Sequence, residues 1–157
     1  MQRAHYIFMP KERGNIALSP YEAEAGYRCL PDEMKDRHLM KHFSVPGYKG
    51  DLTAFKVRGV SMMPKIPHGS LAICKPVNSD FPFIDGQIYV LMMKTGIVIK
   101  KTTRVKDKNN DLTRLKLESL NPKHKPFEIT SEDLLGVYDQ PSIYLYLGHV
   151  TAPESFY

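Results

Sequence analysis

Short apolar runs, rich in β-branched and aromatic residues and separated by polar turns, dominate the chain from residue 54 onward. Runs of this length and composition are typical of β-strands. Twelve prolines and ten glycines supply turn residues between them. The polar segment Lys106–Asp111 reads as a hairpin loop. The predicted strands are Ala54–Val60, Ser70–Lys75, Gln87–Met93, Gly96–Thr102, Leu112–Ser119 and Ser142–Leu147.

Helical periodicity is weak throughout. Pro31–His42 is the best helix candidate, because acidic residues come early and basic residues late, although an irregular exposed excursion fits the same residues. A second short turn is expected at Ser131–Leu134, with Ser131 as its cap. The pattern therefore predicts one all-β domain, residues 19–157, preceded by an N-terminal arm or linker, residues 1–18.

Composition narrows the class of protein. The 157 residues are 42% hydrophobic and 25% charged, as in an ordinary water-soluble domain. The net charge of +5 comes from scattered residues except in Lys94–Lys108, which fits a solvated hairpin edge as well as an acidic partner. Cys29 and Cys74 have no metal-binding spacing, so we expect no metal and no cofactor. With no signal peptide and no apolar run of about 20 residues, we expect a cytoplasmic protein without membrane contact.

The stretch Gly59-Val60-Ser61-Met62-Met63-Pro64 is the first candidate for chemistry, because glycine permits a sharp turn that exposes the serine hydroxyl and nearby backbone amides. A serine becomes a nucleophile only beside a base. None of the six histidines has a convincing strand context beside a carboxylate. Lysine is the alternative base.

The apolar strand Gly96-Ile97-Val98-Ile99 ends in Lys100, where burial would depress the usual lysine pKa of about 10.4. Lys101 follows directly and must point to the opposite face of the strand. Strand alternation alone does not decide which of the two lysines faces Ser61.

These motifs, together with Ile66-Pro67-His68-Gly69-Ser70, Asp85-Gly86-Gln87 and Leu117-Glu118-Ser119-Leu120-Asn121-Pro122, resemble the LexA/UmuD family of self-cleaving serine peptidases. The resemblance implies an all-β fold of the LexA catalytic-domain type, with several short twisted antiparallel sheets around a cleft. It implies Ser61 as nucleophile, Lys100 as general base, and the backbone amides of Ser61 and Met62 as oxyanion hole. The sequence departs from the family pattern at Val60, usually acidic, and at His68-Gly69-Ser70, which replaces Asp-Gly-Asp.

Members of that family cut their own chain upstream of the serine, and the resemblance places the cut at Ala25-Gly26, 36 residues before Ser61. It further implies a homodimer in transcription regulation or the DNA-damage response, with a recombinase filament or DNA polymerase subunits as partners. DNA contact would require an N-terminal domain absent from this chain. Two roles fit: the regulatory half of a repressor, or a UmuD-like polymerase accessory subunit. The alternative of another class is a non-cleaving dimerisation or interaction module of a transcriptional regulator.

Overall fold

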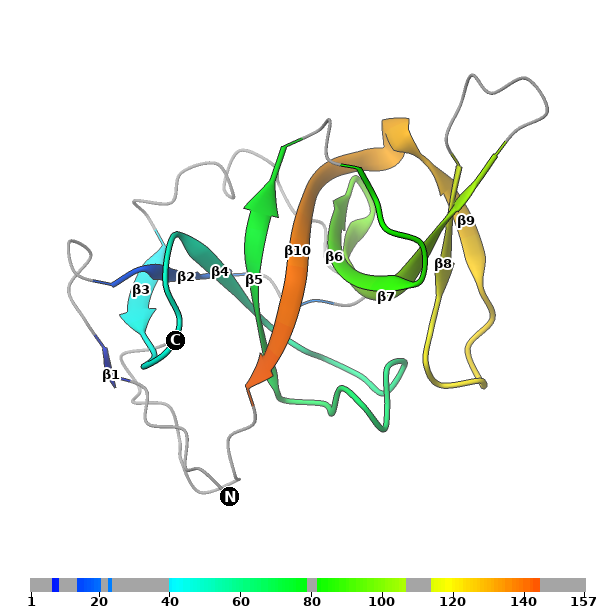
Figure 1. Ribbon diagram of the computed structural model, residues 1–157. Helices are drawn as coiled ribbons and strands as arrows, with labels where there is room; N and C mark the ends of the chain where they lie inside the picture. Colours follow the sequence, from blue (N-terminus) through cyan, green and yellow to red (C-terminus); the bar gives the residue numbers. More distant parts are fainter. Residues whose placement is uncertain are drawn as a thin grey trace.

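A computed structural model describes residues 7–8, 14–20, 23, 40–78, 82–106 and 114–144 (Figure 1). Within these ranges all regular secondary structure is β-strand apart from one short 3-10 turn, which confirms the predicted all-β class. The elements are β1 (Ile7–Phe8), β2 (Ile16–Leu18), β3 (Lys41–Ser44), β4 (Leu52–Lys56), β5 (Leu71–Val77), β6 (Gln87–Met93), β7 (Gly96–Val105), β8 (Arg114–Glu118), β9 (Phe127–Thr130), the 3-10 turn η2 (Ser131–Asp133) and β10 (Leu134–Tyr144).

The strands form one continuous hydrogen-bonded sheet in the order β1-β3-β2-β4-β5-β10-β6-β7-β8-β9. The sequence predicted several sheets, whereas the long strand β10 pairs with β5 on one side and β6 on the other and so joins the two halves (Figure 1). Neighbouring strands are antiparallel except β2 and β4, which are parallel.

The hairpin of β6 and β7 buries apolar side chains on both of its faces. Val90 and Ile99 belong to the cluster that also holds Met62, while Leu91 and Val98 belong to a second cluster with strand β8. Because both faces are covered, these strands read as continuous apolar runs without alternation. The same burial explains why the run before Lys100 is so apolar.

The predicted strands correspond to observed ones with shifted ends. Gln87–Met93 matches β6, and the run that begins at Gly96 continues as β7 to Val105. β10 begins at Leu134, eight residues before the strand predicted at Ser142. The prediction missed this part because Asp139-Gln140-Pro141 has the composition of a turn. In the structure Asp139 and Ser142 both pair with β5, with a register shift between them, so the strand continues through these residues.

Two local predictions were wrong in part. The helix candidate ends in Lys41 and His42, which lie in strand β3, where pairing with β2 decides the conformation; residues 31–39 lie outside the described ranges. The turn at Ser131 exists, but Thr130 precedes it as cap, and its N–H and hydroxyl donate to the Asp133 carboxylate at 2.9 and 3.1 Å.

The hairpin predicted around residues 106–111 joins β7 and β8, which pair antiparallel from Val105 and Arg114 inward. Most of the loop itself, residues 107–113, lies outside the described ranges. The predicted arm, residues 1–18, contains β1 and β2, both of which pair within the sheet. In the part of the chain described, no helix has the length and apolar character to cross a membrane.

Candidate active site

A tight turn after strand β4 carries Ser61. Gly59 has a φ of +91°, in the left-handed region that only glycine adopts without strain. Its N–H donates to Nδ1 of His68 at 2.9 Å, so this histidine supports the turn. The Met63 N–H closes the turn on the Val60 carbonyl at 3.1 Å, and the Met63–Pro64 peptide bond is cis. Ser61 is only 3% exposed, so the expectation that the turn exposes the serine to solvent was wrong.

Asn121 holds the turn from the opposite side. Its side-chain amide donates to the Val60 carbonyl at 3.1 Å, and its backbone N–H donates to the Ser61 carbonyl at 2.9 Å. In a planar trans peptide the N–H points opposite to the C=O. The N–H groups of Ser61 and Met62 therefore point away from Asn121, and neither donates to any other described residue. Two adjacent amides in this orientation can bind an oxyanion.

Lys100 lies in β7, opposite Tyr89 of β6, and is 6% exposed. Its Nζ donates to the Ser119 hydroxyl at 2.8 Å, just beyond the end of strand β8. Lys101 is half-buried and its side chain lies beside the turn at Gly86. The two lysines thus point in different directions, and the one that enters the buried region is Lys100.

Three consecutive residues connect Lys100 to the Ser61 turn. Ser119 accepts from Lys100, the Leu120 N–H points at the Met62 sulfur at 3.4 Å, and Asn121 binds the Ser61 carbonyl. Two residues of extended chain span about 7 Å at most. Buried Ser61 and buried Lys100 therefore sit at the two ends of one short segment, residues 119–121.

The Ser61 hydroxyl makes no hydrogen bond to another residue within the described ranges, and one partner of the Lys100 Nζ is Ser119. Hydrogen bonds between catalytic groups are often long before substrate binds and shorten in the reacting complex. The arrangement supplies a buried hydroxyl, a buried amine and two oriented amides within one region.

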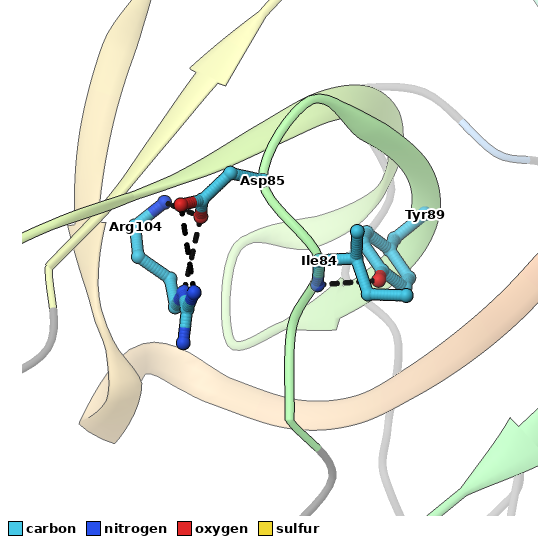
Figure 2. Close-up of polar contacts among 4 residues, drawn as sticks. All are labelled: Ile84, Asp85, Tyr89 and Arg104. Atoms are coloured by element: carbon cyan, nitrogen blue, oxygen red, sulfur yellow. Dashed lines mark hydrogen bonds and ion pairs between the residues drawn. The ribbon is translucent and has the colours of Figure 1, made fainter.

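A polar clasp, formed by Ile84, Asp85, Tyr89 and Arg104, holds the turn before β6 against β6 and β7, the strand that carries Lys100 (Figure 2). The Asp85 carboxylate accepts from the Arg104 N–H at 2.9 Å and from its Nε at 3.0 Å. These hydrogen bonds, and next the charge of Arg104, lower the pKa of Asp85 below its ordinary value. The Tyr89 hydroxyl accepts from the Ile84 N–H at 3.0 Å. The clasp therefore ties the turn before β6 to β7 four residues beyond Lys100.

The proposed cleavage dipeptide Ala25-Gly26 lies outside the described residues, as does Cys29. Ala23, two residues earlier, is buried and forms a parallel bridge with Val57. Its N–H donates to the Lys56 carbonyl at 2.9 Å, and its carbonyl accepts from the Arg58 N–H at 3.3 Å.

Cys74 lies in strand β5 opposite Thr53 of β4, and its buried thiol approaches the Thr53 carbonyl at 3.3 Å. Burial, and to a lesser degree the charge of Asp139, raises the pKa of this thiol far above its ordinary value. Cys74 is thus a structural residue. The described residues hold no group of three His, Cys, Asp or Glu side chains able to bind a metal.

Sequence reasoning assigned no role to Ser119, Asn121 or Ala23. The first two lie in Leu117-Glu118-Ser119-Leu120-Asn121-Pro122, which was recognised as a strand and turn. The available signal was a serine at the end of a predicted strand, two residues before an Asn-Pro turn. Ala23 carried no signal, since a small apolar residue in a polar stretch has many explanations.

A family model described as Peptidase S24-like matches residues 17–138, which include every described residue of the site. None of the curated proteins matches the chain significantly.

Proposed function

Since the chain belongs to the Peptidase S24-like family, the LexA/UmuD type, we propose that it is a serine endopeptidase that cuts its own chain with Ser61 and Lys100. The observation that carries the proposal is the connection of the two buried side chains through residues 119–121. Burial disfavours a charged amine and favours the neutral form that can accept a proton.

In the proposed reaction the Ser61 oxygen attacks the Ala25 carbonyl carbon while Lys100 takes the hydroxyl proton. The N–H groups of Ser61 and Met62 stabilise the oxyanion. The amide bond then breaks, and Lys100 returns the proton to the leaving amine of Gly26. One water molecule hydrolyses the ester between Ser61 and Ala25, again with Lys100 as base, which leaves a carboxylate on Ala25 and restores the serine.

The backbone contacts of Ala23 support Ala25-Gly26 as the bond that is cut. The parallel bridge with Val57 places Ala23 beside the segment that leads from β4 to Ser61. Ala25 is two positions after Ala23, a reach of about 7 Å at most. Tethering replaces the binding of a separate substrate, because it supplies a high effective concentration of the scissile bond.

Incubation of the purified chain at alkaline pH tests the proposal. Mass spectrometry should show fragments that end at Ala25 and begin at Gly26 in the wild type. Ser61→Ala and Lys100→Ala should stay intact, whereas the matched control Lys101→Ala should cleave like the wild type, because its side chain lies beside Gly86. An intact wild type, or cleavage that persists in Ser61→Ala, would refute the proposal.

One observation favours a second candidate, a non-cleaving dimerisation or interaction module. Within the described ranges the Ser61 hydroxyl has no hydrogen-bonding partner, and Lys100 donates to Ser119. A domain that retains the fold without catalysis would keep this arrangement permanently. The same incubation distinguishes the candidates, since a module of this kind stays intact at every pH.

The proposed setting is regulation of transcription or of the DNA-damage response in the cytoplasm, as a homodimer. The repressor and polymerase-accessory forms of this role differ in partner. Pull-down with a recombinase filament, and separately with an error-prone polymerase, would distinguish them.

A further inference from the structure

Two strands that precede the proposed cut lie within the sheet. Strand β2 pairs antiparallel with β3 and parallel with β4, so it occupies the position between them (Figure 1). Strand β1 pairs with the other edge of β3. Among the described strands, β3 pairs only with β1 and β2. The chain before residue 26 therefore connects β3 to the rest of the sheet.

The side chains of this segment contribute to the core. Ile16, Ala17 and Ala23 are each 0% exposed. Ile16 packs in the cluster that contains Phe43, whereas Ala17 and Ala23 pack in the cluster that contains Met62. A strand buried on both faces is held by side chains as well as by its backbone.

Backbone contacts hold both ends of the segment. At its start, the Asn15 side chain donates to the carbonyls of Tyr48 and Gly50 at 3.0 and 2.9 Å, and the Asn15 carbonyl accepts from the Leu52 N–H at 3.0 Å. Gly14 lies so close to β3 that a Cβ there would be 2.8 Å from a backbone nitrogen.

At the other end of the segment, the Ser19 N–H donates to the Ala54 carbonyl at 2.8 Å. Ala23 exchanges hydrogen bonds with Lys56 and Arg58 at 2.9 and 3.3 Å. These contacts all lie on the N-terminal side of the proposed cut.

We propose that cleavage does not release the N-terminal piece: residues 1–25 stay bound as an inserted strand, and the product is a nicked protein of two chains. The inference rests on the proposed function for the position of the cut. Hydrolysis of one peptide bond at Ala25-Gly26 removes no contact of Ile16, Ala17 or Ala23. The signal that follows cleavage is then a separate step, in which β2 leaves and the facing edges of β3 and β4 become available to another extended strand.

A nick made by an external protease separates this inference from self-cleavage. A recognition sequence for a site-specific protease is placed directly after Gly26 in the Ser61→Ala chain, which cannot cut itself under the proposed mechanism. After digestion, native mass spectrometry and size-exclusion chromatography at micromolar concentration should show the two pieces as a 1:1 complex. Denaturant should separate them.

Hydrogen exchange supplies a second measurement that needs no further variant. The amides of Ser19 and Ala23 should keep their protection after the nick, because their acceptors on Ala54 and Lys56 are unchanged.

Ile16→Asp should release the piece from the nicked protein, with at least a hundredfold faster dissociation, since the carboxylate would enter a fully buried position. The control Pro20→Asp adds the same charge at an exposed position and should leave the complex intact.

A freely eluting N-terminal piece, or exchange at Ser19 and Ala23 that becomes complete on nicking, would overturn the inference. If the Ile16→Asp chain does not fold before digestion, the exchange measurement on the nicked chain that keeps Ile16 decides the question. Failure of wild-type self-cleavage refutes the proposed function instead, since the external nick does not depend on it.

Discussion

Removal of the Ser119 hydroxyl is the sharpest test of how the site orients its base. The Lys100 Nζ donates to this hydroxyl at 2.8 Å. We expect Ser119→Ala to fold and to slow self-cleavage, because the amine loses the acceptor that aims it from strand β7 toward the segment bound to Ser61. Ser119 would then be a positioning residue, because it acts through the lysine.

The magnitude follows from the strength of the hydrogen bond. A hydrogen bond to a charged group contributes about 1.5–3 kcal/mol, and in the proposed reaction Lys100 becomes charged as it takes the Ser61 proton. At about 1.36 kcal/mol for each tenfold change in rate, its full loss in the transition state slows cleavage by about 10- to 150-fold. The free energy of unfolding should fall by about 1–3 kcal/mol, since a buried polar group loses a partner.

The assay compares first-order rates of cleavage across a pH series for Ser119→Ala, Ser119→Thr and Thr53→Val. Threonine keeps the hydroxyl and should restore most of the rate. Ser119→Ala should also shift the pH at which the rate is half-maximal, which a purely structural defect would not do. Thr53→Val is the control, because it removes a buried hydroxyl from strand β4. A folded Ser119→Ala chain with wild-type rate and pH profile would refute the reasoning.

Three further predictions concern the turn, the thiol and acid stability. Gly59→Ala should cost about 1–2 kcal/mol in chemical denaturation and slow cleavage, because φ is +91°; Gly47→Ala, with φ of +90° and open space around its Cβ, should lose similar stability at unchanged cleavage rate. Cys74 should resist alkylation by iodoacetamide in the folded protein and react only on unfolding. Mass spectrometry would contradict this prediction if it detected the alkylated Cys74 peptide under native conditions. The hydrogen bonds from Thr130 lower the pKa of Asp133, so the stability that they contribute is complete above its ordinary value near 3.8 and disappears as pH falls through the lowered value. Thermal melts at a series of acidic pH values should show a smaller loss of stability for Asp133→Asn than for the wild type. An equal loss in both chains would refute the assignment.

Much of the fold was readable from local patterns. The runs that became β6 and β7 are apolar, β-branched and bounded by turn residues, so they identify themselves as strands without reference to the rest of the chain. The Gly59–Pro64 stretch likewise predicts a turn by itself, because glycine adopts a positive φ without strain, as Gly59 does in the structure. These features also supplied Ser61 and Lys100 as candidates.

Other features depended on partners far away in the chain. Lys41 and His42 are compatible with a helix, and they are extended because they pair with Leu18 and Ala17 of β2. β10 stays extended through Asp139 and Pro141 because β5 lies beside it. The free energy of pairing between distant segments outweighs a weak local preference, so a short stretch of sequence cannot predict that these residues are extended.

The sequence by itself determined the all-β class, the turn that carries the serine and the apolar strand that ends in the lysine, because each follows from the conformational preferences of adjacent residues. Only the tertiary structure decided that Lys100 rather than Lys101 enters the buried region, that Ser119 and Asn121 connect it to the Ser61 turn, and that β2 lies between β3 and β4. Those contacts join residues 19 to 61 positions apart, and their free energy appears only when the chain has closed the loops between them.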